Sequence, residues 1–181
     1  EENSSVNDEN LSALGLGGMT RGLSPLEITA AYGAIANNGK YVEPIAYTKI
    51  IDKNGHLLLD NTPSETLVVS PQVAYIAGDI LRTTVSNGLA GRAKLSNMVV
   101  AGKTGTTNEQ ADIWFVGYTP YYVSSVWIGN DSPKITISKG SATAASLWQY
   151  INTKVHENLE SKTQFERPDG IVTASICTQS G

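Results

Sequence analysis

The chain has 181 residues, of which 40% are hydrophobic and 17% charged, a balance typical of a globular protein. The net charge of −4 excludes a basic surface for nucleic acid. No apolar run reaches the roughly 18 to 20 residues of a membrane helix, so we expect no membrane segment in this chain. The single cysteine, Cys177, excludes an internal disulfide, and His56 and His156 lack ligand-like spacing. We therefore expect neither a metal nor a cofactor.

The first predicted helix follows a polar start and a glycine-rich turn. Residues 1–10 are polar and acidic, and we expect them to be mobile. Ser24 before Pro25, with Glu27 three positions after the serine, indicates a capped helix start. Asn38-Gly39 marks the helix end. The apolar stripe of this helix is predicted at Ile28, Ala31, Tyr32 and Ile35.

A hairpin and a second helix are predicted next. Asn54-Gly55 is the strongest short hairpin signal, and it separates candidate strands at 45–51 and 56–60. Ser70-Pro71 then begins a helix that Asn87-Gly88 ends. The apolar face of that helix is predicted at Val73, Ile76, Ala77, Ile80 and Leu81.

The second half of the chain predicts a sheet covered by helices. We expect strands at 98–105, 111–118 and 122–129, and the last two carry almost no polar alternation. Such strands are covered on both faces, which indicates a sheet between helical layers. A helix at about 141–158 and an irregular tail at 159–181 follow. Core positions are predicted at Trp114, Trp127 and Trp148, and the apolar face of the last helix at Ala144, Leu147, Trp148, Ile151 and Val155.

The most informative segment is the apolar strand that runs into Lys103-Thr104-Gly105, the candidate catalytic segment. Lys-Thr-Gly is one of three motifs, with Ser-x-x-Lys and Ser-x-Asn, in the sites of penicillin-recognising serine enzymes. A surface turn and a phosphate-binding loop are the alternatives. The loop would need a glycine at Asn97 and a flexible backbone where this chain has an apolar strand, so the nucleotide hypothesis fails.

The residue types in this segment suit recognition of a carboxylate. Thr104 and Thr106 lie on one face of an extended chain, because side chains alternate with period two. Their hydroxyls and the Lys103 ammonium can hold a carboxylate by charge-assisted hydrogen bonds. Gly105 leaves room for a ligand against the backbone.

Several motifs in order resemble the C-terminal part of the transpeptidase domain of class A (bifunctional) penicillin-binding proteins. The resemblance covers nearly all of residues 11–181. Its motifs are Leu16-Gly17-Gly18, Gly22 to Glu27, Ala31-Tyr32, Ala36 to Gly39, Pro44, Ala101 to Thr107, Trp114 to Pro120, Val126 to Gly129, Pro168 to Val172, Ile176-Cys177 and Ser180-Gly181.

The resemblance implies an α/β (α+β) fold, in which a five-stranded antiparallel sheet lies between helical layers, as in serine β-lactamases. It also implies an incomplete fold in this chain, with 11–160 as part of the domain and 161–181 as its irregular tail. In such a transpeptidase, a serine attacks the D-Ala-D-Ala end of a peptidoglycan stem peptide. A second stem amine then takes the acyl group, and β-lactams acylate the same serine.

The resemblance also assigns roles to residues of this chain. Lys103 would assist proton transfer beside the serine of the Ser-x-Asn motif. Thr104 and Thr106 would bind the carboxylate of the substrate or β-lactam, with the Thr106 N–H as one oxyanion donor. Thr107 and Asn108 would line the rim of the substrate-binding site.

The chain departs from the family pattern at the nucleophile. No serine has a lysine three positions later, so Ser-x-x-Lys is absent. Ser5-Val6-Asn7 matches Ser-x-Asn but lies too close to the glycine-rich turn, and we interpret it as accidental. We therefore expect the nucleophile on a missing N-terminal part of the same protein, outside the cytoplasmic membrane of a bacterium. By itself this chain would be inactive, and stable only beside that part.

Two alternatives remain open at the level of sequence. One is a non-catalytic wall-binding or regulatory module that has kept the carboxylate-binding strand. The other is a β-lactamase-type hydrolase on the same fold, which the glycine-rich turn and the long tail disfavour. An upstream Ser-x-x-Lys in the parent protein would favour the transpeptidase.

Overall fold

The structure is a computed structural model that describes residues 11–20, 22–132, 135–177 and 179. The expected mobile start and the Ser5-Val6-Asn7 string lie outside the described residues. The described elements run in the order α1 (Leu11–Gly15), α2 (Pro25–Ala36), β1 (Lys40–Val42), β2 (Lys49–Ile51), β3 (Leu57–Asp60), β4 (Glu65–Leu67), α3 (Pro71–Ser86), η1 (Gly91–Ala93), β5 (Ala101–Thr106), η2 (Asn108–Gln110), β6 (Asp112–Tyr118), β7 (Val123–Gly129) and α4 (Ala142–Val155).

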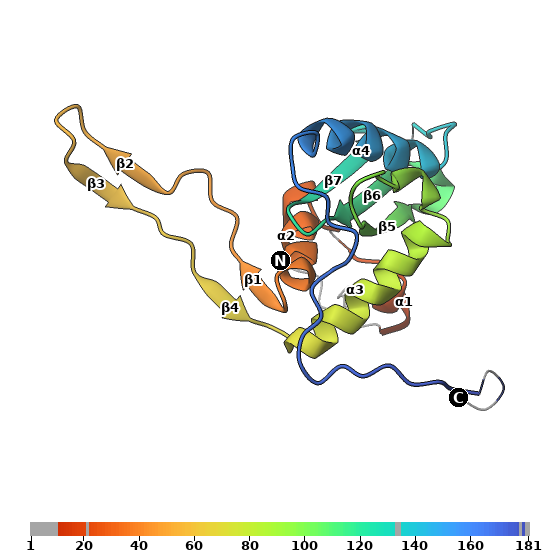
Figure 1. Cartoon of the computed structure of the whole chain (residues 1–181). Helices are drawn as coiled ribbons and strands as arrows, with labels where there is room; N and C mark the ends of the chain where they lie inside the picture. Colours follow the sequence, from red (N-terminus) through yellow and green to blue (C-terminus); the bar gives the residue numbers. More distant parts are fainter. Residues whose placement is uncertain (1–10, 21, 133–134, 178, 180–181) are drawn as a thin grey trace.

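A three-stranded antiparallel sheet, in the order β5-β6-β7, forms the centre of the body (Figure 1). Helices lie on both of its faces, as the hydrogen bonds of two adjacent serines of β7 show. The Ser124 hydroxyl bonds with Asn152 of α4, whereas the Ser125 hydroxyl accepts a 2.7 Å hydrogen bond from Thr29 of α2. Because neighbouring residues of a strand point to opposite faces, α2 and α4 cover opposite sides of the sheet. The expected sheet between helical layers is confirmed, with three strands in the described residues.

The starts of α2 and α3 follow from their capping residues. The Ser24 side chain accepts from the Glu27 backbone N–H at 3.3 Å, and Glu27 Oε2 accepts from the Ser24 backbone N–H at 2.8 Å. This capping box, with Pro25 in the first turn, is the one that the sequence predicts. At the start of α3, the Ser70 side chain accepts from the Val73 backbone N–H at 3.3 Å, and Pro71 lies in the first turn.

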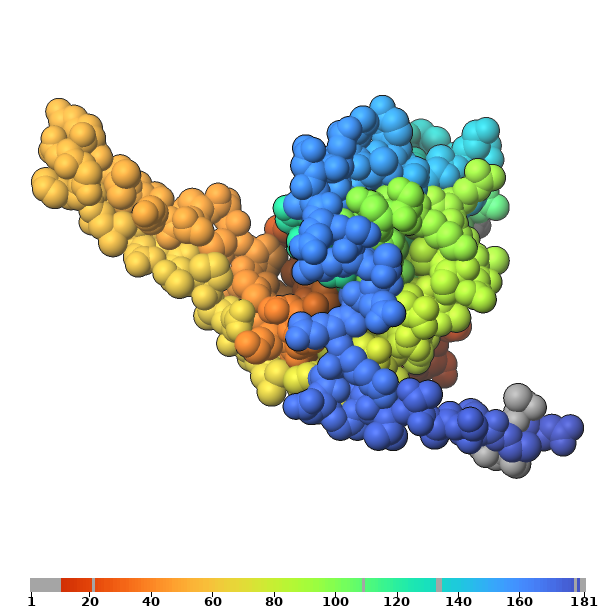
Figure 2. Space-filling model, in the orientation of Figure 1, coloured from red at the N-terminus to blue at the C-terminus, as the bar shows by residue number. Residues whose placement is uncertain are grey.

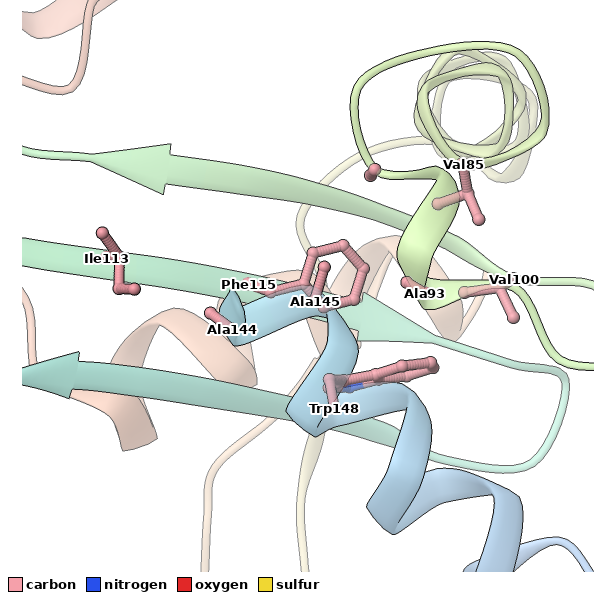
Figure 3. Close-up of a cluster of buried hydrophobic side chains, with 9 residues drawn as sticks. Val85, Ala93, Val100, Ile113, Phe115, Ala144, Ala145 and Trp148 are labelled. Carbon is pink, nitrogen blue, oxygen red and sulfur yellow. The ribbon is translucent and has the colours of Figure 1, made fainter. Parts of the chain in front are cut away.

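The main core lies between α4, the end of α3 and the α4-facing side of the sheet (Figure 3). Trp148 is fully buried, and its ring meets Phe115 edge-on with the centroids 5.2 Å apart. The other buried members of this cluster are Val85, Ala90, Ala93, Val100, Ile113, Ala144 and Ala145. The core therefore joins β6 and the residue directly before β5 to both α3 and α4.

A β-ribbon projects from the body between α2 and α3 (Figures 1 and 2). Strands β1 and β4 form its base and β2 and β3 its outer part. The predicted turn is confirmed, because Gly55 has φ +86° and its N–H donates to the Asp52 carbonyl. The base pairing at residues 40–42 and 65–67 is a feature that the sequence analysis missed.

Four expectations about buried faces are wrong within the described residues. On α2, the predicted Ala31 is exposed, and the buried residue is Ala34. On α3, Val73, Ile76 and Ile80 are 52–64% exposed, and the buried residues are Ala74, Gly78 and Val85. Periodicity identifies an apolar stripe, but it does not say which element covers that stripe. The expectation that the chain is stable only beside a missing part of the protein stays a prediction.

The other two corrections concern α4 and β7. The buried positions of α4 are Ala144, Ala145, Trp148 and Asn152, and Leu147, Ile151 and Val155 are exposed. Small residues face the sheet because they allow α4 to approach it closely. Asn152 also faces the sheet, and its side-chain amide donates to the Ser124 hydroxyl. Trp127 is 40% exposed rather than in the core, and its indole N–H donates to Asp112.

The longest described helix, α3, has 16 residues, and no described helix has the length and apolar character needed to cross a membrane.

Candidate functional site

The Lys-Thr-Gly segment forms most of β5, an edge strand of the sheet. Its register places Lys103 opposite Val116, Thr104 opposite Phe115 and Gly105 opposite Trp114. Phe115 points into the core beneath α4, so Thr104 and Thr106 share the α4 side of the sheet. Lys103 and Gly105 lie on the α2 side. The two threonines share a face as the sequence predicts, and the lysine starts from the opposite face.

The backbone of β5 shows which of its groups point away from the sheet. The Gly102 carbonyl accepts from the Thr84 hydroxyl of α3, and the Thr104 carbonyl accepts from the Lys103 Nζ at 2.8 Å. In an antiparallel strand, alternate residues direct both backbone polar groups to the same side. The N–H groups of Thr104 and Thr106 therefore point to the unpaired edge of β5, away from β6.

The Lys103 side chain bends from its own face back to this edge. The 2.8 Å bond from Nζ to the Thr104 carbonyl brings the ammonium group beside the outward-pointing backbone groups. Lys103 and Thr106 are exposed, and Thr104 and Gly105 are half-buried. In the described part of the chain, no strand pairs with this edge of β5. An ammonium group, two backbone N–H groups and two threonine side chains thus occur along one short open edge.

Two glycines fix the distance of β5 from β6. A Cβ on Gly102 would lie 2.6 Å from the Val116 carbonyl oxygen and 2.6 Å from the Phe115 ring. A Cβ on Gly117, the opposite residue, would meet the same ring at 2.6 Å. Gly102 therefore allows the Phe115 ring to lie across the backbone just before Lys103.

The connection between β5 and β6 is closed by its own hydrogen bonds. Thr107 donates its N–H to the Asp112 carbonyl at 3.0 Å, and its carbonyl accepts from the Gln110 N–H at 3.1 Å. The Thr107 hydroxyl accepts from the Asp112 N–H at 2.8 Å and donates to Asp112 Oδ2 at 3.2 Å. Thr107 therefore has its polar groups engaged in the connection, and its place at the rim of a substrate site stays a prediction. Asn108 is exposed at the start of η2.

Asp112 holds this connection, and the sequence analysis did not single it out. Its side chain bonds to Thr107 and also accepts the indole N–H of Trp127 at 2.8 Å. In the sequence, the only signal was a carboxyl residue directly before a strongly apolar strand.

A separate pocket of about 830 Å³ lies between α2, α3 and the tail, and Lys103 is not among the residues that line it. The tail segment 162–167 forms one wall, and Lys162 pairs with Met98 through an isolated bridge. Tyr118 reaches this pocket, and burial, with a smaller contribution from Tyr32, raises the pKa of its phenol. No group of three His, Cys, Asp or Glu side chains in the described residues is arranged to hold a metal ion.

The sequence profile of the penicillin binding protein transpeptidase domain matches residues 1–151. Penicillin-binding protein 1A of Clostridium botulinum is 41% identical over 172 residues, which is 94% of this chain and 21% of that protein. Penicillin-binding protein 1A of Clostridium acetobutylicum is 44% identical over 162 residues, 89% of this chain and 20% of that protein. The chain belongs to the penicillin-binding protein transpeptidase family and spans about a fifth of the length of these relatives.

Solved structures agree on the fold. A crystal structure of penicillin-binding protein 1A from Haemophilus influenzae superposes with a TM-score of 0.67 at 23% identity, covering 84% of this chain and 29% of that one. The D,D-transpeptidase domain of a peptidoglycan glycosyltransferase from Eggerthella lenta has a TM-score of 0.62 at 26% identity, covering 75% of this chain and 33% of that one. The fold is the α+β fold of penicillin-binding protein transpeptidase domains.

Proposed function

We propose that this chain supplies one wall of the active site of a serine-type peptidoglycan DD-transpeptidase. The observation that carries the proposal is the open edge of β5, where the Lys103 ammonium lies beside the outward-pointing N–H groups of Thr104 and Thr106. An extended peptide can add to such an edge by backbone hydrogen bonds, and a carboxylate can bind the cation and hydroxyls. Family membership and the similarity to the D,D-transpeptidase domain from Eggerthella lenta favour this reaction.

The proposed roles follow from the groups at the edge. Lys103 supplies positive charge beside the serine of the Ser-x-Asn motif and assists proton transfer. Thr104 and Thr106 hold the carboxylate of a stem peptide or β-lactam, and Gly105 leaves the space that the ligand occupies. The Thr106 N–H stabilises the oxyanion, an interaction typically worth about 3–4 kcal/mol of barrier. Thr107 and Asn108 form the rim.

The attacking serine belongs to an upstream Ser-x-x-Lys segment of the longer protein, because no serine of this chain has that spacing. The partners are therefore that upstream part, peptidoglycan stem peptides and β-lactams. The reaction takes place in the bacterial cell envelope, outside the cytoplasmic membrane, to which the longer protein is anchored. This chain without the upstream part is inactive.

The test is acylation of the full-length protein by a fluorescent penicillin. Mass analysis of the labelled peptide should find the label on the serine of Ser-x-x-Lys. Lys103→Gln should lower the second-order acylation rate constant by about 10²-fold or more, because a group that stabilises developing charge is lost. Lys49→Gln is the matched control, since it removes the same charge from the exposed ribbon strand β2. Its rate should equal that of the wild type.

Two results would contradict the proposal. The first is a full-length wild-type protein that takes no label, which would favour a non-catalytic binding module. The second is a Lys103→Gln protein that is acylated as fast as the wild type.

A further inference from the structure

One carboxyl group connects all three strands of the sheet at the end where β5 turns into β6. Asp112 begins β6 and is half-buried. Its Oδ1 accepts the Trp127 indole N–H from β7 at 2.8 Å, and its Oδ2 accepts the hydroxyl of Thr107, the residue directly after β5, at 3.2 Å. The two carboxyl oxygens thus tie the β5–β6 connection to the far strand.

The packing on β7 leaves space for this arrangement. Gly129 pairs opposite Asp112, and a Cβ at Gly129 would lie 2.6 Å from Asp112 Oδ1. The Trp127 indole passes over this glycine and stacks at a tilt on Trp114, with the ring centroids 6.2 Å apart. This position of the Trp127 ring brings its indole N–H to Asp112 Oδ1.

The same face of the sheet carries the proposed catalytic lysine. Side-chain alternation places Lys103, Gly105 and Thr107 on one face of the extended segment, and the register places Asp112 and Trp114 on that face too. Thr106 lies between two residues of this face, and its N–H points to the open edge. The direction of that N–H therefore depends on how Thr107 is held, and Asp112 bonds to Thr107 through backbone and side chain.

We propose that Asp112 is a positioning residue of the transpeptidase site, acting through Thr107 and Trp127 on the backbone of Thr106. The inference rests on the proposed function. Asp112 touches neither the substrate nor the acylated serine. Its bonds fix the end of β5, so that the Thr106 N–H meets the oxyanion in the transition state. Loss of this support lowers the first-order rate of acylation more than it weakens initial binding, because a misplaced oxyanion donor acts on the transition state.

The experiment measures penicillin acylation of the full-length protein by rapid mixing, which separates the binding constant from the first-order acylation step. Asp112→Leu keeps a similar volume and removes both acceptors, whereas Asp112→Asn keeps one oxygen for the Trp127 N–H. We expect the acylation step to slow about tenfold in Asp112→Leu, less than direct removal of an oxyanion donor. Asp112→Asn should recover most of the rate. Asp79→Asn, the same charge change on the exposed face of α3, is the control and should match the wild type.

Trp127→Phe is the second variant, because it keeps the aromatic packing and removes only the indole N–H. The acylation step of Trp127→Phe should also slow. If Asp112→Leu does not fold, this variant tests the positioning role of Asp112 in its place. The proposal is overturned if the folded variants acylate at the wild-type rate, or if only their melting temperatures fall. A wild-type protein that takes no label would instead overturn the proposed function, so the two failures are distinguishable.

Discussion

Gly102 provides the sharpest test of how packing behind the sheet sets the position of the site. A methyl group at this position would lie 2.6 Å from the Val116 carbonyl oxygen and 2.9 Å from the Gly117 Cα, both backbone atoms of the neighbouring strand. Backbone atoms cannot turn away as a side chain can. Relief to an ordinary contact of about 3.4 Å requires β5 to move from β6 by several tenths of an ångström, since a close-packed interior has no spare space.

This displacement should affect both stability and acylation. Overpacking of this kind costs about 1–3 kcal/mol of folding free energy. A shift approaching 1 Å in a catalytic group can cost about 10²-fold in rate. In the full-length Gly102→Ala protein, we therefore expect a lower melting temperature and a fall of at least about tenfold in the penicillin acylation rate.

Gly91→Ala is the matched control for this substitution. A Cβ at Gly91 would meet only the Val85 carbonyl oxygen, at an ordinary 3.9 Å. Its melting temperature and acylation rate should stay at the wild-type values. A Gly102→Ala protein with the stability and acylation rate of the wild type would refute the argument that these contacts hold β5 in place.

Two further predictions concern stability, measured by chemical denaturation of the full-length protein. Trp148→Ala should destabilise the domain by about 3–5 kcal/mol, because it empties a fully buried site against Phe115. Trp148→Phe should cost less. A loss below about 1 kcal/mol in Trp148→Ala would contradict the assigned core. Gly78→Ala should be destabilising, because the new Cβ would lie 2.6 Å from the Tyr118 hydroxyl oxygen. In a Tyr118→Phe background, Gly78→Ala should become neutral or stabilising, since alanine is the better helix former. The coupling free energy between the two substitutions should be about 1–3 kcal/mol, and additive effects on stability would refute the contact.

Local signals in the sequence determined much of the local structure. The Ser24–Glu27 capping box and the Asn54-Gly55 turn occur where the sequence predicts them, because both depend on residues close together in the chain. The apolar strands and their helical cover also followed from the sequence, since strands without polar alternation need shielding on both faces. The Lys-Thr-Gly segment lies in a strand as its apolar approach predicts, and the order of the other motifs indicates the family.

Only the tertiary structure decided which faces are buried and which groups meet at the site. The α3 stripe is apolar in sequence, yet Ala74 and Gly78 are the positions that pack, because burial depends on what lies opposite. The pairing register decided that Lys103 starts on the face opposite Thr104 and returns to the edge through its long side chain. The hydrogen bond between Asp112 and Trp127 joins residues of different strands beside Gly129. Composition and periodicity do not predict it, because it depends on how the strands pair.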